Sequence, residues 1–242
     1  MIRARVPAAL LAPGSLRLTG QEHHYLTRVR RVRPGEAVEL FDGEGGSASA
    51  VLTAIDGEGC ELAVGEVRRA RRAGAQLSAL VPLLKGERMD LCVEKLVEVG
   101  CDRLVLWQAA RSVVRLAPDK RAARVERIRA QVAAAVRQSG QAVLPQVEGV
   151  WSLAEVVQRC QRDRRIALDP AAPRLVPVTA PEASSSSVAL LSGPEGGLAP
   201  EELEQLVTAG FALASLTDTV LRAETAPVVA VALWRWAERA QE

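Results

Sequence analysis

The chain has 242 residues, 48% of them hydrophobic, which is enough for two domains that each bury a core. Its formal net charge is +2, its four cysteines form no C-x-x-C pair, it has only two histidines, and no apolar run approaches about 18 residues. This composition argues against a metal site and a membrane protein. Pro13 and Gly14 interrupt the N-terminal apolar stretch, so it does not resemble a signal-peptide core, and we expect a cytoplasmic protein.

The N-terminal part of the chain is predicted to be mostly β. Three segments alternate between apolar and polar residues: 36–41, 47–55 and 60–64. Asp-Gly pairs, which favour tight turns, separate them. We therefore predict a small β-barrel or sandwich domain over residues 1–72, ending in an arginine-rich linker at 68–72.

From about residue 75 the pattern changes to alternating strands and helices. The predicted strands are 77–81, 104–107, 165–168, 188–191 and one that begins at 213. The predicted helices are 88–99, 119–139, one from Pro200 to Gly210 and one from Pro227. This alternation predicts a mostly parallel α/β sheet over residues 73–242. The last helix is apolar on nearly every side, so we expect its own domain or a second subunit to cover it.

Three basic clusters favour a polyanionic partner. They are 28–33, 68–72 and 103–141, the last with nine basic residues against two acidic ones. The alternative is that these arginines only keep the surface solvated.

One predicted strand runs into a glycine-rich turn, Ser192–Gly197, and then into the helix at Pro200. Ligands of open α/β sheets bind at the carboxyl ends of strands, where this turn lies. The turn lacks the lysine of a phosphate-binding loop and the G-x-G-x-x-G spacing of a dinucleotide site. An acidic, proline-containing turn instead suits a ligand with a cationic centre, such as the sulfonium of S-adenosyl-L-methionine (SAM).

A second segment places Arg222 and Glu224 two residues apart, just before the C-terminal helix. A purely structural explanation is available, because Thr225 is a good helix cap and Glu224 complements the helix dipole. The functional explanation is that both side chains belong to an active site.

Together, G-P-E-G-G at 193–197 and L-R-x-E-T-A at 221–226 resemble the RsmE family of the SPOUT superfamily, the 16S rRNA (uracil-1498-N3) methyltransferases. The motifs at 85–90, 94–100, 111–112 and 138–140 extend the resemblance over essentially the whole chain. It implies an N-terminal PUA-like RNA-binding β-barrel and a C-terminal α/β trefoil-knot methyltransferase domain. It also implies a homodimer that uses SAM and acts on 16S rRNA of the 30S subunit.

The resemblance places the cofactor on three loops. The residues expected to bind SAM are Leu168, Leu191, Ser192, Gly193, Gly197, Leu216, Thr217, Val220, Leu221 and Ala226. The basic clusters and the family motifs together suggest the RNA contacts. They are His24, Arg28, Arg30, Arg31, Arg111, Arg121, Arg124 and Gln138.

The reaction that the resemblance implies suggests three catalytic residues. Uracil N3 is a nucleophile only after it loses its proton, which leaves negative charge on O2 and O4. Arg222 is expected to stabilise this anion, and Glu195 and Glu224 are expected to remove the proton or to hold Arg222. The target base must be unpaired or extruded.

The chain departs from the family pattern L-G-x-R-[IV]-L-R-T-E-T-A. Thr217, Thr219 and Ala223 replace a glycine, an arginine and a threonine, and Thr217 adds a side chain where the adenine is expected. At 137–141 the acid and the arginine of E-Q-S-x-R are missing. Two alternatives therefore stay open: a SPOUT methyltransferase for another rRNA or tRNA base or a ribose 2′-hydroxyl, and a non-catalytic RNA-binding assembly factor.

Overall fold

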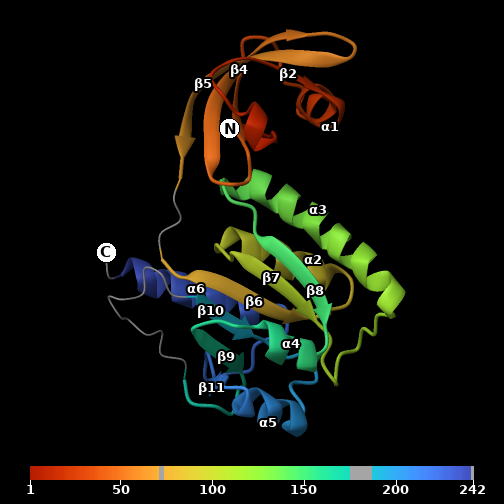
Figure 1. The fold of residues 1–242 in the computed structure, drawn as a ribbon, viewed down its shortest axis with the longest axis vertical. Coiled ribbons are helices and arrows are strands. Elements are labelled where there is room, and N and C mark those ends of the chain that lie inside the picture. The colour runs from red at the N-terminus through yellow and green to blue at the C-terminus, as the bar shows by residue number, and fades with distance from the viewer. Residues whose placement is uncertain (71–73, 175–186, 241–242) are drawn as a thin grey trace. The chain divides into compact units, whose positions relative to one another are not determined.

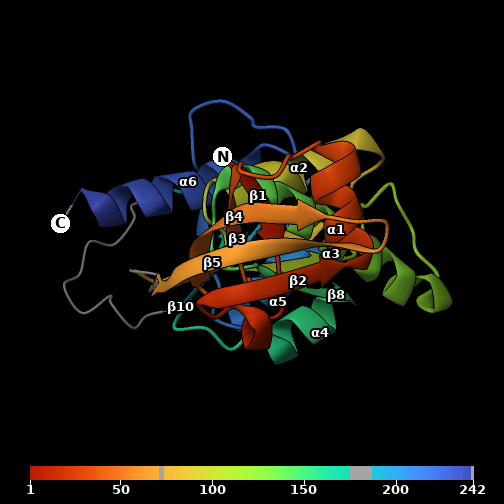
Figure 2. The ribbon, with the colours of Figure 1, turned by 90° about the horizontal axis from the view of Figure 1, so that it is seen from above.

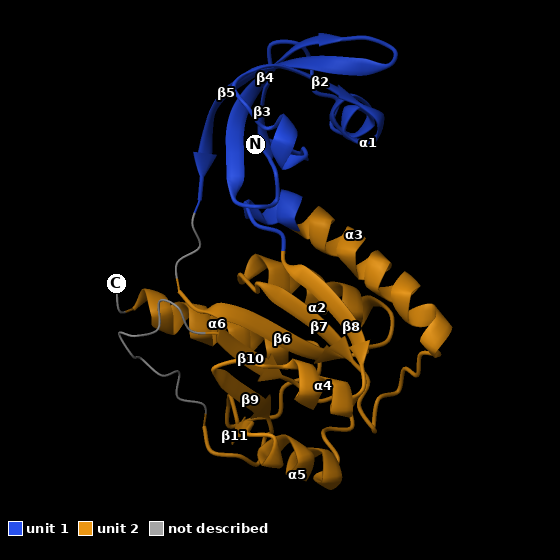
Figure 3. Ribbon diagram, in the orientation of Figure 1, with its two compact units in different colours: residues 1–72, 136–144 blue, residues 73–135, 145–242 orange. Residues whose placement is uncertain are grey.

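The structure, a computed structural model, describes residues 1–70, 74–174 and 187–240 (Figure 1). Contacts divide the chain into two compact units, coloured separately in Figure 3. Unit 1 consists of Met1–Arg72 and Val136–Leu144, and unit 2 of Ala73–Ala135 and Pro145–Glu242. The second segment of unit 1 thus comes from the range for which the sequence predicts the methyltransferase domain.

Unit 1 is built on a five-stranded sheet with the order β1-β3-β4-β5-β2. Its strands are β1 (Ile2–Arg5), β2 (Gly14–Thr19), β3 (Ala37–Phe41), β4 (Gly46–Ile55) and β5 (Gly59–Arg69). Figure 2 shows β4, β5 and β2 side by side, paired antiparallel. The predicted alternation is confirmed, since Val38, Leu40 and Leu52 are fully buried.

Two local predictions for unit 1 need correction. Because β5 continues to Arg69, the predicted linker at 68–72 begins as strand, and residues 71–72 lie outside the described part. The predominantly β N-terminal region also contains a short helix, α1 (Gly20–His24), which continues as one π-helical turn over Tyr25–Val29. The arginines at 28–33 therefore lie on and after a helical turn.

The segment 136–144 is held in unit 1 by a buried arginine. Arg3 is 5% exposed, and its Nη1 donates hydrogen bonds to the carbonyl oxygens of Val136 at 2.8 Å and Gln141 at 2.9 Å. Its Nε donates to Glu39 at 2.9 Å. Val136 belongs to the last turn of α3 (Arg121–Ser139), where a cation satisfies carbonyl groups that lack helical partners.

Unit 2 contains a six-stranded parallel sheet with the order β11-β9-β10-β6-β7-β8, as the strand–helix alternation predicts. Its strands are β6 (Gln76–Pro82), β7 (Arg103–Trp107), β8 (Gln146–Trp151), β9 (Arg164–Leu168), β10 (Ser187–Leu191) and β11 (Ala212–Ala214). Its helices, besides most of α3, are α2 (Glu87–Glu98), α4 (Leu153–Arg159), α5 (Pro200–Thr208) and α6 (Ala226–Arg239).

Strand β8 and helix α4 are not among the elements predicted from the sequence. A reciprocal capping box starts α4: Ser152 Oγ accepts a hydrogen bond from Glu155 N–H, and the Glu155 carboxylate accepts one from Ser152 N–H at 2.9 Å. This S-x-x-E pattern is visible in the sequence and marks a helix start.

Helices cover both faces of the parallel sheet (Figure 1). On one face, alternate strand residues such as Leu80, Val105 and Leu191 share a core cluster with Val156 of α4 and Leu206 of α5. On the other face α6 contacts β6 and β10 and packs against α2. Since β11, β9 and β10 are neighbouring parallel strands, the loops that follow them emerge at one edge. No described helix is long and apolar enough to span a membrane.

Candidate active site

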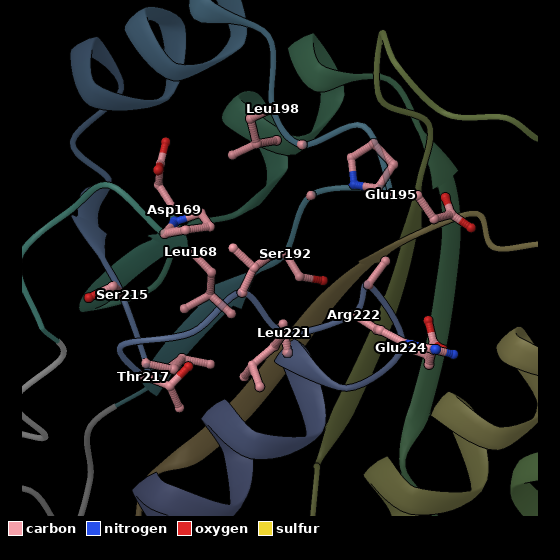
Figure 4. Close-up of a pocket in the computed structure, with 18 of the residues that line it drawn as sticks. Leu168, Asp169, Ser192, Glu195, Leu198, Ser215, Thr217, Leu221, Arg222 and Glu224 are labelled. Atoms are coloured by element: carbon pink, nitrogen blue, oxygen red, sulfur yellow. The ribbon is translucent and has the colours of Figure 1, made fainter.

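A pocket of about 620 Å³ lies at the carboxyl ends of β9, β10 and β11 (Figure 4). This volume is typical of sites for small ligands. Three loops predicted from the sequence contribute to its walls: the residues after Leu168, the turn from Ser192 to Leu198, and the segment from Ala214 to Ala226. The glycine-rich turn and the L-R-x-E-T-A segment therefore meet at one site.

The glycines of the turn after β10 shape the turn itself. A Cβ atom on Gly193 would lie 3.1 Å from Leu198 Cγ and 3.2 Å from Leu198 N, so the turn closes tightly on itself there. Gly197 has φ +69°, a left-handed conformation that favours glycine, and open space around it. The side chain of Trp107 also holds the turn, because its Nε1 donates to Ser192 O at 3.2 Å.

Thr217, which replaces the family's glycine, fits the loop after β11 without backbone strain. Among described residues other than glycine, only Arg31 has a positive φ. Thr217 lines the pocket, and its Oγ1 donates a hydrogen bond to Thr219 O at 2.6 Å. The threonine thus holds its own loop, and it adds a side chain to the pocket wall.

Most of the charged side chains labelled in Figure 4 lie on one side of the pocket, whereas Asp169 lies on the other. In Figure 4, Glu195, Arg222 and Glu224 lie on the right and Leu168 and Thr217 on the left. The Arg222 side chain is 79% exposed, the Glu224 side chain is only 8% exposed, and Arg222 Nη1 lies 4.0 Å from Glu224 Oε1. Glu224 Oε2 is buried and has no hydrogen-bond partner among the described residues. A buried acceptor without a partner is destabilising, so a hydrogen-bond donor at this oxygen would lower the free energy of the site.

Arg88 lines the pocket but is not among the site residues predicted from the sequence. It lies in the first turn of α2, and its Nη1 is 3.3 Å from Glu195 Oε1 in the turn after β10. Its position inside the family-like motif 85–90 is the available sequence signal. Asp169 and Ser215 also line the pocket, and each directly follows the last residue of an observed strand, β9 and β11.

Two further contacts fix the turn after β10 to the loop after β7. Arg111, predicted to contact RNA, donates hydrogen bonds to Gly196 O at 3.2 Å and Leu198 O at 3.4 Å. Glu202 is 6% exposed and accepts hydrogen bonds from Ala110 N–H at 2.7 Å and Ala199 N–H at 2.9 Å. Arg111 is therefore part of the structure of the pocket wall.

The residues around the pocket suit SAM. The pocket offers apolar side chains, exposed backbone of a glycine-rich turn, the carboxylates of Asp169, Glu195 and Glu224, and the unpartnered Glu224 Oε2. These groups match a ligand with an adenosine, an amino group and a sulfonium. Within the described ranges, no three His, Cys, Asp or Glu residues are grouped so that they could hold a metal ion.

Comparison with known proteins gives the family. Residues 71–235 match the RNA methyltransferase domain, and residues 18–64 match the RNA methyltransferase PUA domain. The ribosomal RNA small subunit methyltransferase E of Mycobacterium bovis is 35% identical over 218 residues, covering 88% of this chain and 82% of that protein. The chain belongs to the ribosomal RNA small subunit methyltransferase E (RsmE) family. The resemblance inferred from the sequence is confirmed.

Other RsmE relatives support the same assignment. The Bacillus subtilis protein is 28% identical over 222 residues, which cover 88% of this chain and 87% of that protein. The solved structure of RsmE from Neisseria gonorrhoeae bound to S-adenosyl methionine has a TM-score of 0.85 and 28% identity, covering 96% of each chain. A methyltransferase from Legionella pneumophila in complex with SAM has a TM-score of 0.86 and 26% identity, covering 98% and 97%. The predicted fold class, a PUA-like domain followed by a parallel α/β methyltransferase domain, is confirmed.

The RsmE pocket contains most of the residues predicted from the sequence. All three catalytic candidates line it, and so do the following cofactor candidates: Leu168, Ser192, Gly193, Gly197, Leu216, Thr217, Val220, Leu221 and Ala226. Leu191 does not line it, because this side chain is buried in the sheet core beneath.

The predicted RNA contacts fall into two groups. Unit 1 carries His24, Arg28, Arg30, Arg31 and Gln138, all exposed, and unit 2 carries Arg111, Arg121 and Arg124. Arg31 adopts φ 55°, which is unusual for a residue other than glycine.

Proposed function

We propose that this RsmE family member transfers a methyl group from SAM to N3 of a uridine in 16S rRNA of the small ribosomal subunit. The pocket carries the proposal: it joins a glycine-rich cofactor loop to an exposed arginine and a buried carboxylate with an unpartnered oxygen. The relatives' names and the two SAM-bound structures support both the cofactor and the substrate.

The predicted cofactor residues would hold SAM between the loops after β9, β10 and β11. SAM supplies a methyl group that is already activated by its positive sulfur. The apolar side chains of Leu168 and Leu221 and the backbone of Gly193 offer a surface for the adenosine. The family's trefoil knot, in which the C-terminal segment passes through a loop, remains part of this proposal.

Arg222 and Glu224 have distinct roles in the proposed reaction. Arg222 is mostly exposed and can reach the oxygens of a base that enters the pocket, where its charge would stabilise the imide anion. The Glu224 carboxylate, whose Oε1 lies 4.0 Å from Arg222 Nη1 and whose buried Oε2 has no partner among the described residues, would accept the N3 proton. Glu195 is the weaker candidate for this step, because Arg88 already contacts its carboxylate.

Domain 1–72 is proposed to bind the rRNA, and domain 73–242 is proposed to bind SAM and carry out the reaction. The exposed cations His24 (when protonated), Arg28, Arg30 and Arg31 would bind phosphates of the RNA. We place the enzyme in the cytoplasm, where small ribosomal subunits are found.

We also propose a homodimer formed through α6. On this helix Leu233 is 37% exposed and Trp236 is 71% exposed, although the opposite side of the helix is buried in unit 2. A large aromatic side chain left in solvent next to an exposed leucine is typical of an interface. We expect Trp236→Glu to convert a dimer to a monomer in size-exclusion chromatography with light scattering, and a wild-type monomer would contradict the proposal.

Mass spectrometry of 16S rRNA tests the reaction. RNA from a strain that lacks the gene should lose one N3-methyluridine, and the purified protein with SAM should restore it. A different missing modification would instead indicate another SPOUT methyltransferase. Loss of no modification, together with no SAM binding in calorimetry, would indicate a non-catalytic assembly factor.

Arg222→Ala tests the site within the same assay. We expect methyl transfer to fall by about 100-fold or more, with unchanged thermal unfolding, because the side chain is exposed and acts on the developing anion. Lys95→Ala is the matched control, since Lys95 is an exposed cation of unit 2 that pairs with Glu98 outside the pocket. Full activity of Arg222→Ala would remove this residue from the mechanism.

A further inference from the structure

The pocket has a second arginine that the proposed mechanism does not use. Arg88 lines the same pocket as Arg222 but comes from a different element, the first turn of α2. Its side chain is 51% exposed, and Glu195 is 26% exposed. Two arginine–glutamate pairs, Arg88–Glu195 and Arg222–Glu224, therefore line one pocket.

The contact between Arg88 and Glu195 is longer than that of a well-formed ion pair elsewhere in this protein. Arg88 meets Glu195 through a single contact of 3.3 Å. The structural pair Arg103–Glu148, by contrast, has two hydrogen bonds of 2.6 Å each, from Nε and Nη2. A guanidinium carries five N–H donors in a planar fork, so Arg88 keeps most of its donors for another acceptor. A residue whose only role was to hold the turn after β10 would be expected to pair as Arg103 does.

The chemistry of the target calls for two cations. When the N3 proton of uracil moves to the Glu224 carboxylate, the electron pair stays on N3 and spreads to O2 and O4. These oxygens flank N3 on opposite sides. One arginine can stabilise the charge on one oxygen, and the other oxygen needs its own donor.

We propose that Arg88 is the second anion-stabilising residue, so that Arg88 and Arg222 bind the two imide oxygens of the target uracil from two sides. This inference rests on the proposed function. It gives Arg88 a direct catalytic role, and it explains a preference for a base with a carbonyl on each side of a ring N–H. Cytosine has one such carbonyl and an amino group on the other side, which would face an arginine donor.

The acidity of the substrate tests this role. 5-Fluorouridine loses its N3 proton more easily, because fluorine withdraws electrons, and so it depends less on stabilising cations. We compare single-turnover methylation of RNA containing uridine or 5-fluorouridine by wild type and by Arg88→Ala. On uridine we expect Arg88→Ala to be slower by about 100-fold, and Arg88→Lys to recover part of the rate. On 5-fluorouridine the loss should shrink to about 10-fold or less, and it should also shrink as the pH is raised.

Controls separate this role from a structural one. Arg88→Ala should bind SAM in calorimetry and unfold thermally as wild type does, and Lys95→Ala, on the same helix, should match wild type on both RNAs. An equal loss on both RNAs at all pH values, or no loss, would overturn the role of Arg88 while leaving the proposed function in place. If the wild type makes no N3-methyluridine on either RNA, the proposed function fails and this inference fails with it.

Discussion

Gly193 and Gly197 shape the turn after β10 in different ways. At Gly193 any side chain would meet Leu198, whereas at Gly197 the space is open and only the left-handed φ favours glycine. Both effects act within the loop itself. The two glycines thereby set the path of the backbone that lines the pocket.

Gly197→Ala tests this account. We expect the variant to lose about 1–2 kcal/mol of unfolding free energy in urea and to bind SAM more weakly in calorimetry, because alanine strains the left-handed backbone. Gly57→Ala is the matched control, since Gly57 has no positive φ and open space around it. An unchanged stability of Gly197→Ala would show that the turn relaxes at no cost.

Burial makes the cysteines unreactive. All four are buried, and the pKa of the Cys92 thiol is raised to about 12, first by burial and then by nearby Cys101 and Glu224. The four cysteines therefore act as small core residues.

Among the elements, α3 was predicted to present its arginines to RNA, but several of them have partners within the protein. Arg127 contacts Asp90, and Arg129 contacts Glu126 and donates to Val147 O. Arg124 differs, because burial, followed by the positive charge of Arg127, lowers its pKa. A phosphate beside Arg124 would counter the positive charge of Arg127.

Two variants distinguish an arginine of α3 that is expected to bind RNA, Arg124, from one that is bound within the protein, Arg129. Arg124→Gln should weaken RNA binding and reduce its salt slope by about 1, with little change in stability. Arg129→Gln should mainly lower the unfolding temperature, because its hydrogen bond to Val147 is lost. Binding is measured over a range of salt concentrations by fluorescence anisotropy. Equal salt slopes for wild type and Arg124→Gln would show that Arg124 contacts no RNA phosphate and only keeps the surface solvated.

The elements that sequence patterns identified are those with regular periodicity. Strands β3, β6, β7 and β10 were predicted to within one or two residues, since each is a continuous apolar or alternating segment. The short helix α1 and its π-helical turn contain too few residues for a helical pattern to emerge. The capping box of α4 was a usable signal that was overlooked.

At the scale of the whole molecule, Arg3 forms hydrogen bonds between segments that are more than a hundred positions apart in the sequence. Its buried guanidinium binds Glu39 of β3, the carbonyl group of Val136 in the last turn of α3 and that of Gln141 just after the helix, although its Nη2 has no partner among the described residues. Arg137 provides a second long-range contact, because it forms an ion pair with Glu22 and its Cζ lies 4.9 Å from the centre of the Tyr25 ring. Unit 1 is therefore incomplete without residues 136–144.

Arg3→Ala should lower the unfolding free energy by about 2–4 kcal/mol, because it leaves buried carbonyl groups without donors. Arg5→Ala, on the same strand but exposed, should change stability by less than about 0.5 kcal/mol. Urea denaturation measures both. Equal effects of the two substitutions would show that segment 136–144 contributes little to the stability of unit 1.

The sequence by itself determined the two fold classes, most strands of the parallel sheet, the three loops of the pocket and the catalytic candidates Arg222, Glu195 and Glu224. These features depend on local periodicity, turn residues and short motifs, which a single segment contains. Only the tertiary structure decided that Arg88 meets Glu195, that Glu224 keeps an unpartnered oxygen, that Leu191 is core and that 136–144 joins unit 1. Each of these depends on side chains from distant segments, whose packing no local pattern encodes.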